Sequence, residues 1–269
     1  MSRNIAIVGA FDDLRSPGVR LLEEAAALGP LTTLVTSDES IVAHTGKPPK
    51  FPLAERLYLL SSLRFVSKAL PAGDLFPIDE LKTEAISIWA DAESSENEKR
   101  GEWCRKHQVE YRVFTSTQLS GFPVQSPLTR SSKGKKVVVT GCYDWFHSGH
   151  VRFFEEVSTY GDLYVVVGHD ANIRLLKGAG HPLLPQEERR YMVGAVRHVT
   201  QALISSGQGW LDADPEIQVI KPDIYAVNED GDRGGKKEYC AQRGIEYLVL
   251  KRSPAPGLPQ RTSTNLRGF

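Results

Sequence analysis

Residues 136–157 read KVVVTGCYDWFHSGHVRFFEEV and join a short, β-branched apolar run to an amphipathic segment. The run KVVVTGC (136–142) is typical of a strand that is covered on both faces of a parallel sheet. The segment from about 149 to 160 has an apolar stripe at Val151, Phe154 and Val157, which predicts a helix. A strand that leads directly into a helix favours a Rossmann-like α/β fold, whose ligands sit at the carboxyl ends of the strands.

The same pattern occurs twice in the chain. Residues 11–25 match residues 143–157 at 6 of 15 positions, and residues 52–70 match residues 185–203 at 8 of 19. A third pair of blocks, EWCRKHQVEY (102–111) and EYCAQRGIEY (238–247), follows in the same order. We therefore predict a tandem duplication of one α/β unit.

The duplication predicts two Rossmann-like domains of the HUP type with parallel sheets, residues 1–130 and 131–269. The connection between them is expected in FPVQSPLTRSSKGKK (122–136), which is rich in proline, serine and basic residues. Strands are predicted at 4–9, 31–37, 86–90 and 110–114, and again at 136–142, 162–168, 223–227 and 246–251. Helices are predicted at about 18–28, 53–63 and 97–107, and again at 149–160, 186–196 and 234–243.

Composition excludes several classes of protein. The 269 residues are 41% apolar and 25% charged, as in soluble globular proteins, which excludes disorder and collagen. Lysine plus arginine (33) equals aspartate plus glutamate (33), so broad binding to nucleic acid or to an anionic membrane is not expected. We expect no signal peptide and no membrane span. Three scattered cysteines, Cys104, Cys142 and Cys240, form no disulfide framework, and we expect a cytoplasmic protein.

The turn GCYDWFHSGH (141–150) carries the first chemical signal. The free N–H groups and the positive dipole end of a helix's first turn form an anion site, which favours a bound phosphate. His147 and His150 would add two side-chain donors there. Zinc ligation by the pair is a weaker alternative because no third ligand cluster stands out. Structural histidines are the other alternative.

With these residues in view, the chain resembles the HxGH nucleotidyltransferases. Within them it is similar to the cytidylyltransferase-like family, and most of all to the phosphoethanolamine enzymes, which also carry two such domains. The resemblance rests on GCYDWFHSGH, GDLYVVVGHDANIRLLKG (161–178), PQEERRYMV (185–193), KPDIYAV (221–227) and KRSPAPGLPQRTSTNLRG (251–268), in this order.

The resemblance implies a reaction and its substrates. A substrate phosphate attacks the α-phosphate of a nucleoside triphosphate, expected to be CTP, and pyrophosphate leaves. The expected acceptors are phosphoethanolamine, phosphocholine or glycerol 3-phosphate. Mg²⁺ would be bound through the triphosphate, with no protein metal site, and a homodimer is a partner that the resemblance allows.

The resemblance also implies roles for individual residues. His147, His150 and Lys177 of the RLLKG loop would be catalytic, and Asp144 and Trp210 would bind the acceptor. Arg189 would hold phosphate or brace the site. The first copy keeps this arginine as Arg56, which favours the bracing role. Nucleotide or phosphate binding would fall to Gly141, Cys142, Tyr143, Gly149, Arg189, Asn228, Asp230, Arg252, Arg261, Thr262, Ser263 and Thr264.

Two stretches depart from the family pattern. A longer, proline-containing PAPGLPQ separates Lys251-Arg252-Ser253 from Arg261-Thr262-Ser263-Thr264, so either arginine could fill the family's position, and the TST run could be a plain helix N-cap. The acidic turn at 228–232 also differs, which weakens the assignments for the base and the acceptor.

The first copy has lost the chemistry-bearing residues. Arg15 replaces His147, Gly18 replaces His150, and Thr45 replaces Lys177. We therefore expect residues 1–130 to be a degenerate, non-catalytic domain. Its Arg15, Lys47 and Lys50 could still bind an anion or form a solvated basic rim.

Two other functions remain open. One is ATP-dependent adenylyl transfer, because the adenylyltransferases for heptose phosphate, pantetheine phosphate, nicotinamide nucleotide and flavin share the histidine motif. The other is a non-catalytic, nucleotide-sensing protein, against which the intact histidine pair argues.

Overall fold

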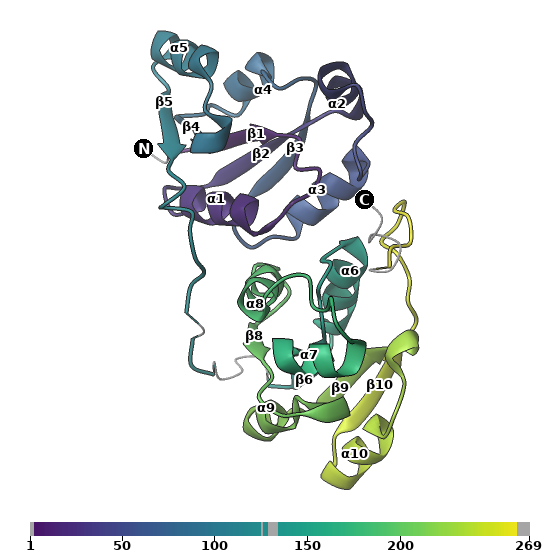
Figure 1. Cartoon of the computed structure of the whole chain (residues 1–269). Coiled ribbons are helices and arrows are strands. Elements are labelled where there is room, and N and C mark those ends of the chain that lie inside the picture. The colour runs from purple at the N-terminus through teal and green to yellow at the C-terminus, as the bar shows by residue number, and fades with distance from the viewer. Residues whose placement is uncertain (1–2, 125, 129–133, 263–269) are drawn as a thin grey trace. The chain divides into compact units, whose positions relative to one another are not determined.

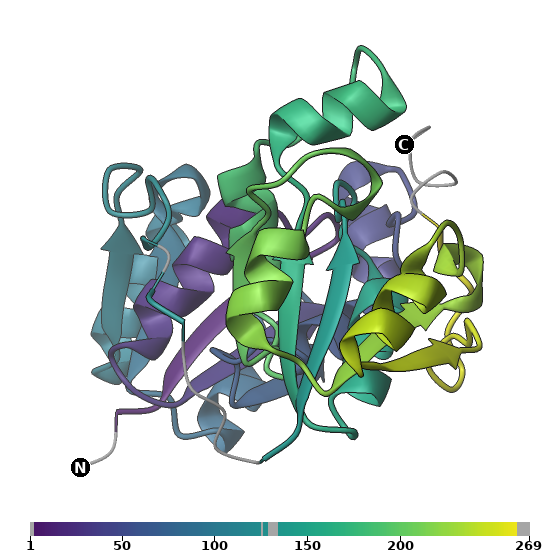
Figure 2. The ribbon, with the colours of Figure 1, turned by 90° about the horizontal axis from the view of Figure 1, so that it is seen from below.

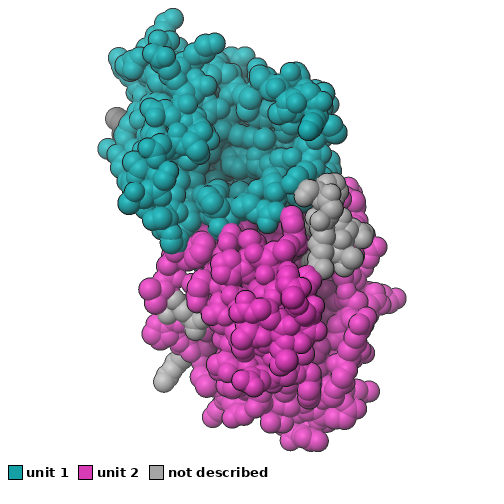
Figure 3. All heavy atoms as spheres, viewed as in Figure 1, with its two compact units in different colours: residues 1–121 teal, residues 122–269 magenta. Residues whose placement is uncertain are grey.

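The computed structural model describes residues 3–124, 126–128 and 134–262 (Figure 1). The chain forms two compact units, Met1–Gly121 and Phe122–Phe269 (Figure 3). This division falls at the start of the connection that the sequence predicts. Phe122 belongs to the second unit because its ring stacks on Tyr191, with centroids 5.1 Å apart. The carbonyl of Pro123 accepts a 2.6 Å hydrogen bond from Arg190.

The first unit contains a five-stranded parallel sheet in the order β3-β2-β1-β4-β5. Its elements are β1 (Ile5–Gly9), α1 (Ser16–Ala26), β2 (Leu31–Thr36), α2 (Asp38–Thr45), α3 (Leu53–Ser61), β3 (Lys68–Ala72), α4 (Ile78–Thr83), β4 (Ile88–Ala92), the 3-10 helix η1 (Glu93–Ser95), α5 (Glu98–His107) and β5 (Glu110–Phe114).

The second unit contains another five-stranded parallel sheet, in the order β8-β7-β6-β9-β10. Its elements are β6 (Lys136–Gly141), α6 (Ser148–Val157), β7 (Asp162–Val167), α7 (Asp170–Lys177), α8 (Gln186–Gly194), β8 (Gln201–Ile204), η2 (Gly209–Leu211), α9 (Asp214–Ile220), β9 (Ile224–Asn228), η3 (Glu229–Gly231), α10 (Lys236–Arg243) and β10 (Glu246–Leu250).

The α/β class and the two parallel sheets are confirmed. Strand for strand, the order in the second sheet corresponds to the order in the first. Two units with one strand order agree with two Rossmann-like domains. The duplication itself stays a prediction from the sequence repeat.

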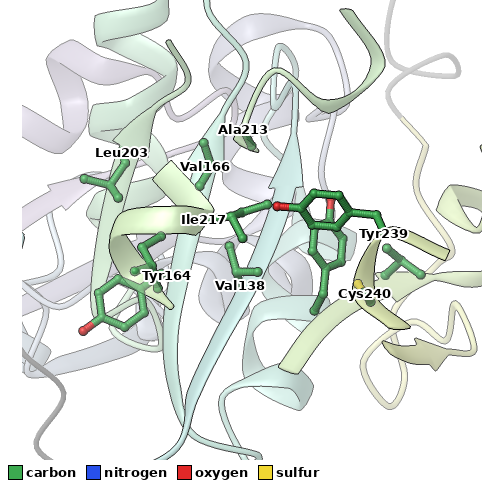
Figure 4. Packing of buried hydrophobic residues seen from close by; sticks show 11 residues of the cluster. Val138, Tyr164, Val166, Leu203, Ala213, Ile217, Tyr239 and Cys240 are labelled. Carbon is green, nitrogen blue, oxygen red and sulfur yellow. The ribbon is translucent and has the colours of Figure 1, made fainter. Parts of the chain in front are cut away.

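In the second unit, helices cover both faces of the sheet. Figures 1 and 2 show α9 and α10 on one face and α6 and α8 on the other. Ile217 of α9 and Tyr239 of α10 pack with Val138 and Tyr164 of the central strands in one buried cluster (Figure 4). Each fully buried apolar side chain of this kind contributes about 1.5–3 kcal/mol. The burial of this core fixes the strand ends that carry the candidate site.

The structure also contains elements that the sequence analysis did not predict, which are β3, β8, α2, α4, α7 and α9. One of them corrects a position. Lys177 is the last residue of α7, not part of a loop, and the helix ends where Gly178 adopts φ 86°. His169 is the N-cap of this helix, and its side chain accepts a hydrogen bond from the Asn172 N–H.

Candidate active site

A cavity of about 320 Å³ lies at the carboxyl ends of β6 and β9 in the second unit. This volume is within the usual range of small-molecule sites. It is also where parallel α/β sheets bind ligands. The described residues that line it are Thr140, Gly141, Cys142, Tyr143, Asp144, Trp145, Gly149, His150, Phe153, Lys177, Ala226, Val227, Asn228, Asp230, Gly231, Lys236, Arg252 and Thr262.

The turn after β6 is shaped by a glycine and a left-handed residue. Tyr143 has φ 54°, a conformation that L-residues with side chains rarely adopt. Its ring folds back over Gly141, where an added Cβ would lie 2.7 Å from the ring. A glycine at position 141 is therefore required for this turn. The turn brings Cys142 and Tyr143 to the cavity wall.

His147 caps the first turn of α6. It is fully buried, and its Nδ1 accepts a 3.1 Å hydrogen bond from the Gly149 N–H. An accepting Nδ1 carries no proton, so the neutral ring carries its proton on Nε2. Burial, together with the charges of Arg252 and Arg261, lowers the pKa of His147 to about 3. His147 is therefore a neutral imidazole near neutral pH. It lies behind the cavity wall rather than in it.

His150 lines the cavity and stacks on His147, with ring centroids 3.9 Å apart. The Tyr143 and Phe146 rings flank it at 5.2 Å and 5.9 Å. Burial, and then the neighbouring charges, hold the pKa of His150 well below its ordinary value. Within the described part of the chain, its buried Nδ1 has no hydrogen-bond partner. Such buried unpaired groups are rare and occur at functional sites.

Lys177 reaches the cavity from the end of α7. The residue is exposed, and its ammonium group interacts with the Cys142 side chain. Burial raises the pKa of the Cys142 thiol, although Lys177 and Arg189 act in the opposite direction. The thiol is therefore protonated at neutral pH. Lys177 supplies a positive charge on the side of the cavity next to the β6 turn.

The C-terminal segment brings Arg252 and Thr262 to the cavity. Arg252 donates a 2.8 Å hydrogen bond from Nη2 to the Arg261 carbonyl, and its Nη1 forms an ion pair with Asp230. That carbonyl would lie 3.3 Å from a Cβ added at Gly149, so a glycine here lets the segment approach α6 closely. Of the two arginines that the sequence left open, Arg252 lines the cavity and Arg261 does not. Ser263 and Thr264 lie outside the described residues.

Asp144 lines the cavity but uses its carboxylate to hold a loop. Both carboxylate oxygens accept from the Leu183 N–H, at 2.7 and 2.9 Å, and one also accepts from Leu184 N–H at 3.0 Å. In the first unit, Asp12 accepts in the same way from the N–H groups of Lys50 and Phe51. A contact present in both units belongs to the fold. Asp144 is therefore not available as the free acceptor-binding carboxylate that the sequence suggested.

Arg189 is fully buried and lies outside the cavity wall. Its guanidinium donates to the carbonyls of Leu184, Cys142 and Gly168 and to the Asp170 carboxylate. Arg56 in the first unit donates to the carbonyls of Phe51, Ala10 and Thr36 and pairs with Asp38. The correspondence supports the bracing role for Arg189. Four of its five N–H donors are already occupied, which leaves little capacity for a phosphate.

Trp210 is not brought to the cavity. It is 54% exposed, in η2, and its ring lies over Gly234 and Gly235 at the start of α10. Its proposed contact with an acceptor therefore has no support from the cavity's lining residues. In contrast, Asn228 and Asp230 line the cavity, and their role in nucleotide binding stays a prediction.

Lys236 lines the cavity and was missed by the sequence analysis. It is the first residue of α10 and follows the glycine pair at 234–235. The pattern GGKK at a helix start is a weak signal for a basic group beside a strand end. Only the structure separates Lys236, in the cavity, from the exposed Lys237.

In the ranges 3–124, 126–128 and 134–262, no group of three or more His, Cys, Asp or Glu side chains is placed to hold a metal ion. Among the helices in these ranges, none is sufficiently long and apolar to cross a membrane.

Comparisons with known proteins agree with the geometry of the second unit. The family model described as cytidylyltransferase-like matches residues 138–257. The FAD synthase of Ferroglobus placidus is 38% identical over 120 residues, which are 44% of this chain and 75% of that protein. The FAD synthase of Methanocella paludicola is 32% identical over 135 residues, 49% of this chain and 93% of that protein.

A third relative has a longer chain. The bifunctional protein HldE of Nitratiruptor sp. is 34% identical over 107 residues, 39% of this chain and 22% of that protein. The histidine turn, the cavity at the strand ends and these matches lead to one family. The chain is a nucleotidyltransferase that belongs to the cytidylyltransferase-like family, within the HxGH superfamily.

Proposed function

We propose that the protein is an ATP-dependent adenylyltransferase that joins AMP to FMN, forming FAD and pyrophosphate. The observation that carries this proposal is the match to proteins named FAD synthase. Two of them are 38% and 32% identical to this chain over 75% and 93% of their own length. Relatives that match over most of their length are the best guide to a substrate class within a superfamily that shares one motif.

This proposal replaces the substrates that we expected from the sequence. CTP was favoured there by the resemblance to the cytidylyltransferase-like family, and phosphoethanolamine by the two similar halves of the chain, whereas adenylyl transfer to flavin was an alternative. The curated relatives favour that alternative. The duplicated architecture is therefore a poor guide to the acceptor.

The reaction needs no proton transfer by the protein. An oxygen of the FMN phosphate attacks the α-phosphorus of ATP, a new P–O bond forms, and the bond from the α-phosphorus to the bridging oxygen breaks. Pyrophosphate leaves with the electron pair of that bond. Because the second pKa of a phosphate monoester is about 6, the attacking oxygen is already deprotonated at neutral pH. No general base is required.

The neutral histidines suit this chemistry. Negative charge develops on the oxygens of the α-phosphate and of the leaving group, and preorganised donors stabilise that charge. His147 keeps its proton on Nε2, because its Nδ1 accepts from Gly149. The lowered pKa values of both histidines keep them as neutral hydrogen-bond donors rather than acids. Lys177 supplies positive charge at the cavity wall, where Arg252 is held by its ion pair with Asp230.

ATP would enter as its Mg²⁺ complex, with the ion as part of the substrate. The cavity carboxylates agree with this arrangement. Asp144 accepts backbone N–H groups, and Asp230 pairs with Arg252, so neither is free to hold a resident metal. The phosphates would then provide the oxygen ligands that Mg²⁺ prefers.

The decisive experiment measures kcat/KM for ATP and CTP with FMN, and then for FMN against phosphoethanolamine, phosphocholine and glycerol 3-phosphate. Pyrophosphate release and the organic product are both quantified. We expect ATP to exceed CTP by at least about 10²-fold, because a site that pairs with one base leaves polar groups unpaired with another. A preference for CTP, or turnover only with an alkyl phosphate, would refute the proposal.

A further inference from the structure

The two units differ near the carboxyl ends of two corresponding strands, β4 in the first unit and β9 in the second, of which β9 contributes to the candidate cavity. Strands β4 and β9 correspond at a shift of 136 residues between their first residues, and β5 and β10 correspond at the same shift. At this shift Asp91 corresponds to Val227 and Arg100 corresponds to Lys236. Each unit thus has a cation at the start of the helix that follows this strand.

In the first unit, the cation Arg100 is neutralised in a buried ion pair with Asp91. Arg100 Nη1 donates to both carboxylate oxygens of Asp91, at 2.7 and 2.9 Å, and the two side chains are only 9% and 2% exposed. Tyr111 also donates to Asp91, at 2.8 Å, and the Arg100 guanidinium lies 5.0 Å from the centroid of the Trp89 ring. The charges of this pair cancel, and the pair fills the place beside the end of β4.

In the second unit the carboxylate is absent from this place. Val227 cannot accept a hydrogen bond, and both Val227 and Lys236 line the cavity. The Lys236 ammonium donates 2.7 Å to the Gly231 carbonyl. In the described ranges of the chain, no carboxylate lies within ion-pair distance of it. Asp230 is already paired with Arg252.

The surroundings of Lys236 favour an anionic ligand. Burial lowers the pKa of its ammonium, an effect that Asp232 partly offsets and Arg233 adds to. A partly desolvated cation in a cavity gains more from an anion than a solvated one does, because the local dielectric constant is lower. One carbonyl partner leaves donor capacity on an ammonium that has three N–H groups.

We propose that Lys236 binds a substrate phosphate group, and that the Asp91–Arg100 pair closes the corresponding place in the first unit. The inference rests on the proposed function, which supplies two sources of phosphate. One source is the triphosphate of ATP, and the other is the phosphate of FMN. Lys236 thereby joins Lys177 as a cation that lines the cavity, whereas the charge of Arg252 is already paired with Asp230. The ion pair also explains why the first unit would have no nucleotide site.

The test is direct binding to the full-length chain, measured by calorimetry with three separate probes, which are Mg²⁺–ATP, inorganic pyrophosphate and FMN. The variant Lys236→Met removes the ammonium group. Its matched control is Lys237→Met, which removes an equal charge from the exposed neighbour. A lost charged hydrogen bond should weaken binding about 10- to 100-fold in the first variant. The control should bind all three probes within about twofold, as expected of an exposed charge.

The pattern across probes identifies the source of the phosphate. Weaker binding of ATP and pyrophosphate assigns Lys236 to the triphosphate, whereas weaker binding of FMN alone assigns it to the acceptor. Lys236→Arg should recover most of the affinity, since it keeps the charge. Unchanged binding of all three probes by Lys236→Met, or an equal loss in the Lys237→Met control, would overturn the proposal. Absence of binding by the unmodified chain would overturn it as well.

A second variant gives the second unit the carboxylate that Asp91 supplies at the corresponding position of the first unit. Val227→Asp should pair with Lys236 and weaken binding of the same probe, whereas Val227→Asn adds a polar group without the charge and should weaken it less. Equal affinities in these two variants would contradict the charge argument. Binding needs no turnover, so a chain that forms no FAD but loses ATP affinity on Lys236→Met would fail the proposed function and keep this inference.

Discussion

Replacement of His147 by asparagine separates its structural contribution from its chemical one. The side chain is fully buried, and its Nδ1 caps α6 by accepting from the Gly149 N–H at 3.1 Å. Asparagine is among the best N-cap residues, so His147→Asn keeps an acceptor for that N–H group. The variant lacks the imidazole ring, which stacks on His150 of the cavity wall with centroids 3.9 Å apart and thereby positions it.

The two contributions have different sizes and different readouts. Losing the position of His150, the histidine that lines the cavity, should cost the factor of about 10²–10³ in kcat/KM that is typical of a lost preorganised donor. Removing the cap costs about 1 kcal/mol, or about 2–4 °C in the melting temperature of a domain of this size. We therefore expect His147→Asn to melt near the wild-type temperature with its activity reduced by about 10²–10³. His147→Ala should lose the same activity and also melt several degrees lower.

The assay pairs thermal unfolding by circular dichroism with pyrophosphate release, on both variants and the wild-type protein at one substrate concentration series. A folded His147→Asn protein with nearly wild-type kcat/KM would refute the chemical role. Inactivity confined to the alanine variant would show that His147 acts only as a helix cap.

Three further predictions concern stability and the first unit. The pKa of buried His147 is about 3, below the usual value near 6.5, so the folded state binds fewer protons than the unfolded state between these values. The contribution of His147 to the free energy of unfolding should thus be full above pH 6.5 and fall as the pH drops towards 3, by up to about 1.4 kcal/mol per pH unit. In urea unfolding at several pH values, the free energy of unfolding of His147→Asn should depend less steeply on pH than that of the wild-type protein. Arg189→Lys and Arg56→Lys should each cost about 3–5 kcal/mol in urea unfolding, because each breaks one of the two equivalent buried networks. A stable Arg189→Lys protein that no longer binds ATP would instead favour the phosphate role. Arg15→Ala with Lys47→Ala should leave kcat within about twofold, since Arg15 already pairs with Asp13, and collapse of turnover with an intact fold would place the first unit in the reaction.

The strand-to-helix turn at the site could be predicted from sequence because its signals are local. The apolar run of β6 is buried along its centre, and α6 begins at Ser148, close to the predicted start. The histidine motif indicated His147 and His150 as candidate site residues. In the structure their rings stack with centroids 3.9 Å apart. The repeat also pointed to a bracing role for Arg189, through its counterpart Arg56.

Other parts of the site depend on contacts that a sequence does not display. The sequence did not predict α7 (Asp170–Lys177) and placed Lys177 in a loop. Leu175 and Leu176 are 70% and 54% exposed, whereas Ile173 is buried. Lys236 and Lys237 are neighbouring lysines that the sequence does not distinguish. The direction of α10 after β9 places Lys236 in the cavity wall and leaves Lys237 exposed. Asp144 looked like a ligand carboxylate until its backbone partners across the 181–184 loop were known.

The most direct measurement follows isotopic phosphate through one reaction. Purified chain is incubated with Mg²⁺, FMN and ATP labelled at either the α- or the γ-phosphate, and FAD and pyrophosphate are separated by chromatography. We predict that α-label enters FAD, that γ-label enters pyrophosphate, that the two products form in a 1:1 ratio, and that His150→Ala strongly reduces the yield of both. Label from the γ-phosphate in a flavin product, or a labelled product with CTP and none with ATP, would contradict the proposed reaction.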